Sequence, residues 1–562
     1  MFIKFLKSFL FILLIFNQTS LYSKNNNKNE FNSKDLSNYF SAQVSYDNER
    51  NKEALKFFKL SRSLIDKHDP FLKQYIFSLV LEGNVKKAIR QSKLSSIKES
   101  SSFFEAYLLL TIDSLKKGDL KKTTKYINDL SRYKDNGTLE LVIYETLSDF
   151  NYLFKNKKIP LNKSNFGNMT LITKAFQSCY LNKANTSTYF TNLINSDEID
   201  YSRYIFFYVS YLIEQSKFTE AKQIIDQVDL LNTNLLTAQT KKWVDKKELK
   251  KFAKLFSCKN ELDIISEFFF LIANLYSSQN DFEESNFYLN ISNFLNPKFK
   301  FNLSFLAENY YEKKNYTRSK KILNLLSDNN EIYYWYKIKK KANIIFKESN
   351  QENSINYINL NFEKIKNPST KILFDMANIA KGFKKYEVAI NYYNKVLSRL
   401  KPTSLSYPDI LYRRGGSYER LNQFKNSDDD LLNSLKIAPD NAYVLNYLAY
   451  SWLERNYKIE TAISMLEKAY QQKKNDPFII DSVGWAHYLT GNLIKAEEFL
   501  KRAIKLMPDD PVVNDHYGDI LWKLDRKIQA RYYWNSVLNF ENSENEMKKN
   551  IIIKLLKGLQ KS

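Results

Sequence analysis

The sequence predicts an all-α protein, a right-handed superhelical solenoid of helix–turn–helix repeats. Three observations support this prediction. Units of 34 residues recur toward the C-terminal end, Gly (11) and Pro (10) are scarce among 562 residues, and hydrophobic residues make up 44% of the chain. Hairpin-rich β folds need more turn residues than this. A repeat array also lets a long chain bury hydrophobic residues between neighbouring repeats instead of in one large core.

The first residues have the order of a Sec signal peptide. Lys4 and Lys7 precede the short apolar run 8–16, and the polar stretch 17–23 ends in the small residue Ser23. Because spanning a bilayer takes about 20 apolar residues, the run is too short to be a transmembrane helix. We therefore expect a signal peptide at 1–23 and a location in the periplasm or cell envelope. The alternative is an uncleaved amphipathic start. No cysteine lies near residue 23, so a lipoprotein anchor is not expected.

The next segments match the repeat pattern weakly. Residues 24–35 are polar and are expected to form a disordered spacer. We expect degenerate repeats at 36–137 and clearer repeats at 261–407, where small residues recur at repeat spacing. The stretch 138–260 is expected to be helical on composition alone, and a break of the solenoid into two arcs is expected there if the array is not continuous.

Four well-formed repeats are expected at 408–544. Two helices that cross closely need small residues at the crossing and large ones beside it. In each repeat the first helix carries a small residue, namely Gly415, Ala449, Gly484 and Gly518. Twelve or thirteen positions later the second helix carries another small residue, namely Ser427, Ala462, Ala496 and Ala530. Four positions beyond that a large apolar residue follows, namely Leu431, Leu466, Leu500 and Trp534. A capping helix is expected at 545–562, covering the last repeat with Ile551, Ile552, Leu555 and Leu556.

The spacing resembles the tetratricopeptide repeat, whose unit is 34 residues. Repeat 477–510 is the best match, with Gly484, Gly491, Ala496, Ala503 and Pro508 in place. The segments 481–486 (DSVGWA) and 513–522 (VNDHYGDILW) are similar to those of exported tetratricopeptide proteins of proteobacteria. The resemblance implies a periplasmic or envelope-facing scaffold.

No pattern of catalytic or metal-binding residues is present in the sequence. His68, His487 and His516 do not pair at the spacing that places two ligands on one helix face. A hydrogen-bonded helix histidine is the preferred interpretation of His516. We therefore expect no enzyme activity, no metal and no cofactor.

Cys179 and Cys258 form no CxxC pair. A disulfide between them would need an oxidising compartment, and two buried helix cysteines are the preferred interpretation.

The first helices of tetratricopeptide repeats line a concave face, and residues three and four apart share one stripe on a helix. On this register the candidate peptide-binding residues are aromatic and acidic: Tyr443, Asn446 and Tyr450; Phe478, Asp481, Trp485 and Tyr488; Asp515, Asp519 and Trp522. Aromatic side chains anchor interfaces, and carboxylates favour Lys or Arg on a ligand. The alternative for each aromatic residue is a place in the core between repeats.

Charge separates two functional hypotheses. The whole chain carries a net +23, whereas 408–544 holds 18 Lys and Arg against 20 Asp and Glu, a net −2. The preferred hypothesis is a non-enzymatic scaffold that binds a protein or peptide in the concave face. The alternative is a binder of an anionic envelope polymer or nucleic acid through the lysine-rich upstream surface. Nucleic acid is the less favoured of these partners, and no small-molecule substrate is expected. After removal of the signal, no segment is expected to span a membrane.

Overall fold

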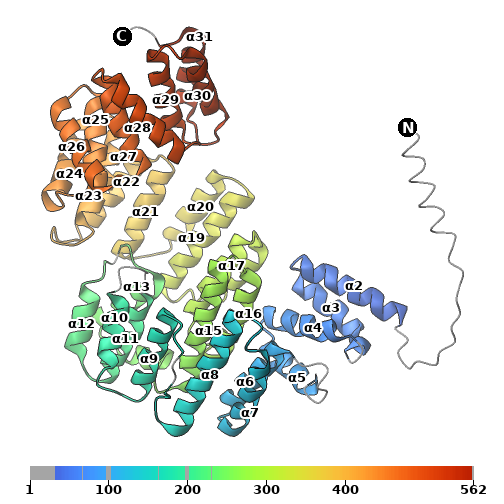
Figure 1. Ribbon diagram of the computed structural model, residues 1–562. Helices are drawn as coiled ribbons and strands as arrows, with labels where there is room; N and C mark the ends of the chain where they lie inside the picture. The colour runs from blue at the N-terminus through green and yellow to red at the C-terminus, as the bar shows by residue number, and fades with distance from the viewer. Residues whose placement is uncertain are drawn as a thin grey trace, which may run out of the picture. The chain divides into compact units, whose positions relative to one another are not determined.

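The computed structural model describes residues 32–65, 68–95, 103–161, 164–195, 202–229 and 231–559. Every regular element within these ranges is a helix, and the helices form a solenoid of helix–turn–helix repeats, as the sequence predicts (Figure 1). The predicted signal peptide at 1–23 and the first part of the predicted spacer lie outside the described residues. The chain divides into two compact units, here named the N-terminal unit (1–227 with 234–358) and the C-terminal unit (228–233 with 359–562).

The N-terminal unit contains the helices α2 to α19. Their bounds are α2 Ser33–Asp47, α3 Asn51–Leu60, α4 Asp69–Leu81, α5 Val85–Ser95, α6 Phe104–Lys116, α7 Leu120–Leu130, α8 Thr138–Asn156, α9 Asn168–Tyr180, α10 Thr186–Ile194, α11 Arg203–Glu214, α12 Phe218–Asp226, α13 Leu235–Asp245, α14 Lys250–Leu255, α15 Glu261–Ser278, α16 Phe282–Leu295, α17 Phe301–Glu312, α18 Tyr316–Leu323 and α19 Glu331–Glu348. The first of them begins inside the predicted spacer 24–35, because Asn32 caps α2 by accepting a hydrogen bond from the Lys34 amide at 2.8 Å.

Contacts between distant parts of the chain tie the N-terminal unit together. The Phe77 ring of α4 stacks on Phe287 of α16 with centroids 4.5 Å apart. The Arg318 guanidinium of α18 donates to Glu82 Oε2 at 2.8 Å, across 236 positions in the sequence. The first repeats therefore pack against α16 and α18 as well as against their sequence neighbours. A purely nearest-neighbour solenoid would lack such contacts.

A disulfide joins Cys179 of α9 to Cys258, which lies in the loop after α14. Both residues are buried, as expected, but the preferred interpretation of two unpaired helix cysteines was wrong. The fold brings together residues 79 positions apart. The surrounding contacts hold the same two segments, since Lys259 Nζ donates to the Tyr180 carbonyl at 3.0 Å and the Tyr180 hydroxyl donates to Glu261 at 2.7 Å.

The chain divides at a different point from 138–260, the stretch in which a break was expected if the array was not continuous. The division lies after Ile358, within α20 (Gln351–Phe362), and the short segment 228–233 belongs to the C-terminal unit. Leu231 is buried there in a cluster that includes Phe374 and Tyr393, and its carbonyl accepts a hydrogen bond from Lys371 Nζ at 2.7 Å. Apart from 228–233, the poorly matching stretch 138–260 belongs to the N-terminal unit, and its described residues are mainly helical, as expected.

The C-terminal unit is built from antiparallel helix pairs. Its helices are α21 Thr370–Gly382, α22 Tyr386–Leu397, α23 Tyr407–Glu419, α24 Phe424–Ile437, α25 Ala442–Glu454, α26 Ile459–Gln472, α27 Pro477–Leu489, α28 Leu493–Leu506, α29 Pro511–Lys523, α30 Lys527–Asn539 and α31 Asn545–Lys557. The same cap starts three successive first helices, because the side chains of Asn441, Asp476 and Asp510 accept hydrogen bonds from the following backbone amides. This repetition fixes the register of the helices that carry the candidate groove.

The predicted crossings of small against large residues are present. A Cβ on Gly484 would lie 2.7 Å from Leu500 Cγ, and a Cβ on Gly518 would lie 2.4 Å from the Trp534 ring. Ala496 is fully buried at the centre of the same core, whereas the neighbouring Lys495 is exposed. The 34-residue register derived from the sequence is therefore correct for these repeats.

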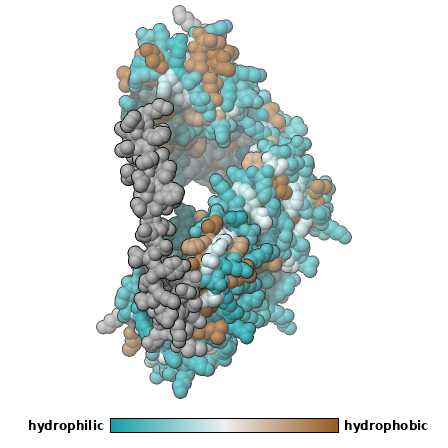
Figure 2. Space-filling view, turned by 90° about the vertical axis from the view of Figure 1, so that its right-hand side faces the viewer, coloured by the Kyte–Doolittle hydropathy of each residue, from teal (hydrophilic) through white to brown (hydrophobic). Residues whose placement is uncertain are grey.

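The helix α31 packs on the last repeat in the place predicted for a capping helix. Ile551 is fully buried and Leu555 packs partly against the same core. Ile552 and Leu556, which were expected to share this role, are 47% and 75% exposed instead. Figure 2 shows hydrophobic residues on the surface at the upper end of the molecule, the level at which Figure 1 places α29 to α31.

Candidate peptide-binding groove

The ten candidate residues lie on the first helices α25, α27 and α29. The second residue of each helix is a large hydrophobic side chain left in solvent. Tyr443 is 47% exposed, Phe478 is 57% exposed and Val512 is 41% exposed. These three are each the second residue after the capping residue, so they form an apolar edge that recurs in three successive repeats.

An aromatic stack lies along the stripe below this edge. The Trp485 ring stacks on the His516 ring with centroids 4.0 Å apart and an interplanar angle of 11°. Tyr488 stacks on Trp485 at 4.6 Å, and Trp485 Nε1 donates to Glu454 Oε1 at 2.6 Å. Trp485 is half-buried rather than part of the core. It therefore joins residues from α25, α27 and α29 into one surface.

A buried ion pair holds His516 in place. Its Nδ1 lies 2.9 Å from Asp481 Oδ2, and both side chains are buried. Burial lowers the pKa of His516, but the bonded Asp481 and the charges of Asp515 and Asp519 outweigh it and raise the pKa overall. The Tyr450 hydroxyl lies 3.5 Å from His516 Nε2. Asp481 and Tyr450 are thus connected through a histidine rather than directly.

Two buried acceptor atoms in this region have no hydrogen-bond partner within the described residues. They are Asp481 Oδ1 and Asn446 Oδ1, at equivalent positions of α27 and α25. Leaving a buried acceptor unpaired costs about 1–3 kcal/mol. Other buried side-chain atoms of the described residues, such as Trp452 Nε1, also lack a partner, so these two atoms do not by themselves mark a binding site.

The stripe on α29 is used differently, because α31 covers it. Lys554 Nζ donates to Asp515 Oδ1 at 2.6 Å and to the two Asp519 oxygens at 2.8 and 2.9 Å. Trp534 Nε1 also donates to Asp519, at 3.0 Å. Burial and the charge of Asp515 raise the pKa of Asp519 to about 6. The two carboxylates that we expected to attract a ligand cation are therefore paired with a cation of the same chain.

Trp522 also belongs to this cap. Its ring lies 5.3 Å from that of Trp534, and a Cβ on Gly558 would lie 2.0 Å from a Trp522 ring carbon. Gly558 has φ 73°, a conformation that suits glycine, so it closes α31 directly over the indole. Trp522 supports the cap, and the open part of the predicted groove is limited to α25 and α27.

Three residues that contact the groove were not among the groove candidates: His516, Glu454 and Lys554. The interpretation of His516 as a hydrogen-bonded helix histidine is confirmed, and its partner Asp481 lies a full repeat away. Lys554 lies in a lysine-rich tail, and Asp515 and Asp519 lie on the first helix of the last repeat. Opposite charge was the one available signal that the tail would pair with these two carboxylates.

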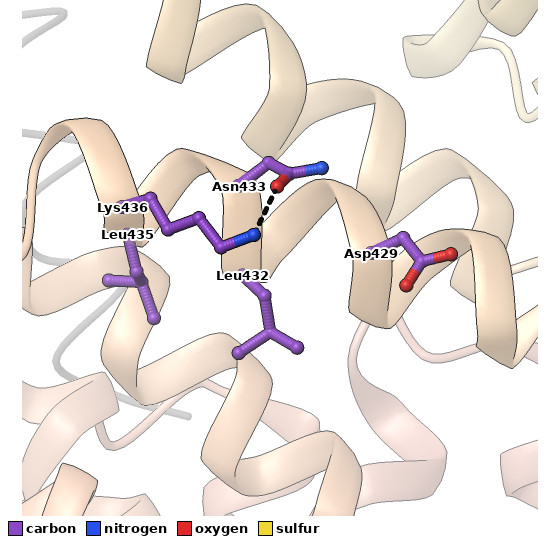
Figure 3. A pocket seen from close by; sticks show the side chains of 5 residues that line it. All are labelled: Asp429, Leu432, Asn433, Leu435 and Lys436. Atoms are coloured by element: carbon purple, nitrogen blue, oxygen red, sulfur yellow. Dashed lines mark hydrogen bonds between the residues drawn. The ribbon is translucent and has the colours of Figure 1, made fainter.

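The hollow on α24 in the C-terminal unit does not form a convergent site. A hollow of about 430 Å³ on α24 is lined by Asp429, Leu432, Asn433, Leu435 and Lys436, and Lys436 Nζ donates to Asn433 Oδ1 at 3.0 Å (Figure 3). All five side chains come from a single helix. Within the described ranges, no group of three or more His, Cys, Asp or Glu side chains is arranged to hold a metal ion. None of the described helices is long and apolar enough to cross a membrane.

Comparisons with known proteins agree with the repeat assignment. The chain is 34% identical over 116 residues to a TPR repeat-containing protein of Pseudomonas aeruginosa, covering 20% of each chain. It is 28% identical over 112 residues to bacteriophage adsorption protein A of Escherichia coli, covering 20% of this chain and 11% of that protein. The chain thus matches a fifth or less of the length of these curated relatives. No protein-family profile matches it.

Solved structures with similar folds share 18% sequence identity with the chain. A TPR protein of Thermus thermophilus is covered in full, over 34% of this chain, with a TM-score of 0.30. MamA of Desulfovibrio magneticus is covered over 99% of its length and 32% of this chain, with a TM-score of 0.26. The 34-residue register and the match to the Pseudomonas protein show that the chain contains repeats of the tetratricopeptide type, similar to those of a proteobacterial TPR protein.

Proposed function

We propose that the protein is a non-catalytic scaffold of the cell envelope that binds an extended peptide along α25 and α27 of its C-terminal unit. Repeats of this class build protein-interaction scaffolds. The observation that carries the proposal is the exposure of Tyr443 and Phe478 at the same repeat position, beside the half-buried stack of Trp485 on Tyr488. A peptide supplies the apolar side chains that would cover such a surface.

The charge of the groove specifies the peptide. Glu454 is exposed beside Trp485, and its carboxylate can accept from a Lys or Arg side chain of the ligand. The pairing of Lys554 with Asp515 and Asp519 supplies an internal example of the same chemistry. We therefore expect a ligand with a basic residue next to an aromatic or aliphatic one.

The location in the envelope rests on two independent features. The order of residues 1–23 is that of a Sec signal peptide. The buried disulfide between Cys179 and Cys258 supports export, because disulfides persist in oxidising compartments and are rare in the cytosol. Mass spectrometry of the mature protein from an envelope fraction tests this part. An intact Met1 in the cytosolic fraction would contradict it.

A peptide array provides the test of binding. Each pair of peptides should differ only in one residue, Lys in one member and Glu in the other, and the full-length protein should prefer the Lys member. Phe478→Ser should weaken binding by roughly thirtyfold, since losing an aromatic anchor typically costs about 2 kcal/mol. Ile494→Ser is the matched control, because Ile494 is 83% exposed on α28 and lies outside the groove.

The expected result is loss of peptide binding in Phe478→Ser and normal binding in Ile494→Ser, with unchanged melting of both variants. Equal binding by all three proteins would show that the apolar edge has no part in recognition. A preference for the Glu peptides would contradict the proposed ligand chemistry.

A further inference from the structure

A second cavity lies in the N-terminal unit, where α5, α6 and α16 meet. Its volume is about 260 Å³, and its wall is strongly basic. The charged residues that line it are Lys86, Arg90, Lys93, Asp113, Lys116 and Lys117. Five cations thus face one carboxylate. The contact of Lys116 with Phe294, 178 positions away in the sequence, completes the wall.

Asp113, the one carboxylate among the described residues that line the cavity, already has ion-pair partners. Asp113 forms ion pairs with Lys93 and with Lys117, the latter at 2.7 Å. Lys86 and Arg90, one helical turn apart on α5, form no hydrogen bond or ion pair with another described residue. Lys86, Arg90 and Lys116 therefore line the cavity without an ion pair to any carboxylate among the described residues.

Lys116 differs from an ordinary surface lysine. Its Nζ donates to the Phe294 carbonyl at 2.7 Å and lies 4.4 Å from the centre of the Phe294 ring. Burial and the nearby charge of Lys86 lower the pKa of Lys116. The ammonium group is held at the cavity by the fold, close enough to Lys86 for the two charges to repel. A bound anion would relieve that repulsion.

The remaining wall is apolar. Ile89 is buried between the basic residues of α5, and the Phe294 ring lines the opposite part of the cavity. A solvated basic surface would offer charges alone, whereas this cavity combines unbalanced cations with hydrophobic contact area. The combination suits a ligand that joins an anionic head to a small apolar body.

We propose that this cavity is a binding site for a phosphate-bearing ligand, with the phosphate oxygens held by Lys86, Arg90 and Lys116 and the apolar part of the ligand against Ile89 and Phe294. Arginine offers paired N–H donors that match phosphate geometry, and lysine adds point charges. The site is independent of the peptide groove, because all of its residues belong to the N-terminal unit.

Inorganic pyrophosphate is the probe, titrated calorimetrically into the full-length protein at low salt. The test variant is the triple change Lys86→Ala, Arg90→Ala and Lys116→Ala. Its control removes the same charge from exposed lysines that do not line the cavity: Lys87→Ala, Lys121→Ala and Lys125→Ala. Binding to the wild type should saturate at one site, and the test variant should bind at least about tenfold more weakly, while the control stays within about twofold.

Two results would overturn the proposal. One is the absence of saturable pyrophosphate binding by the wild type, and the other is equal weakening of the test and control variants, which would indicate a general effect of net charge. Melting curves of all three proteins show whether each variant is folded. A fourth protein with Arg90→Lys keeps the charge and should bind with intermediate strength, because it loses the paired donors.

Vesicles of phosphatidylcholine with and without phosphatidylglycerol separate two sources of the phosphate. Sedimentation with the anionic vesicles, reversed by pyrophosphate and absent in the test variant, would assign the cavity to a lipid headgroup. Saturable binding of pyrophosphate without sedimentation would assign it to a soluble phosphate ester. Both results support a phosphate site.

Discussion

The two units of this chain reach stability by different routes. In the C-terminal unit the repeats from α23 to α30 pack on their sequence neighbours, and the same caps and small-residue crossings recur every 34 or 35 residues. One distant segment, 228–233, also packs in this unit, beside α21 and α22. The N-terminal unit has weaker repeats but adds contacts between distant segments, such as Phe77 with Phe287 and the disulfide of Cys179 with Cys258. Regular repeats make local packing sufficient, whereas degenerate repeats here are accompanied by long-range ties.

The largest expected effect is removal of the disulfide. Cys179→Ser with Cys258→Ser should destabilise the N-terminal unit by about 4 kcal/mol, because a cross-link closing a loop of this size restricts the unfolded chain by roughly that amount. Hydrogen exchange followed by mass spectrometry should show faster exchange in peptides of the N-terminal unit and unchanged exchange in those of the C-terminal unit. Equal acceleration in both units would mean that they unfold together and that the comparison fails.

Overpacking a repeat crossing should act on the other unit. Ala496→Leu places a large side chain where Ala496 is fully buried beside Leu500, and we expect a loss of about 1–3 kcal/mol. The matched control Lys495→Leu changes an exposed neighbour and should stay within about 0.5 kcal/mol. Thermal melts of the two variants measure the difference. Equal melting temperatures would contradict the register of the repeats.

A smaller effect is expected from pH, and in the C-terminal unit we expect it to come from His516. The pKa of His516 is raised in the folded protein, so its pair with Asp481 contributes fully below the unfolded pKa of about 6.5. That contribution is lost as pH rises through the raised pKa. For one proton, the free energy of unfolding then falls by at most about 1.4 kcal/mol per pH unit. The pKa of Asp519 is also raised, to about 6, so its loss of a proton also lowers the stability of the folded protein as pH rises, over a lower pH range.

Denaturant melts between about pH 6.5 and pH 8 should therefore show falling stability of the C-terminal unit. His516→Gln should flatten this dependence, since it removes the titrating group. If the slope survives in His516→Gln, or if stability rises with pH, the buried pair is not its source.

Much of the fold followed from the sequence because its determinants are local. Gly484, Ala496 and Leu500 lie within one repeat, so spacing alone identified the crossing. The disulfide and the packing of Phe77 on Phe287 join residues far apart in the chain, and no periodicity encodes which distant segments meet. The division after Ile358 was missed for the same reason.

In the groove, too, the local features could be predicted from the sequence and the tertiary ones could not. The stripe positions on α25, α27 and α29 could be read from helical spacing, and the exposure of Tyr443 and Phe478 fits that reading. Which carboxylates remain available depends on where the tail packs. Lys554 reaches Asp515 and Asp519 only because Ile551 and Gly558 seat α31 on the last repeat. That arrangement is tertiary, and the spacing of residues within repeats could not predict it.

The central claim is that peptide binds on α25 and α27 and not on the capped helix α29. A photoreactive benzoylphenylalanine at position 443, 478 or 512 tests it directly, because Tyr443, Phe478 and Val512 share one repeat position and are all exposed. With a lysine-containing peptide selected on the array, we predict strong cross-linking from positions 443 and 478 and weak cross-linking from position 512. Cross-linking mainly from position 512, or from none of the three, would contradict the account.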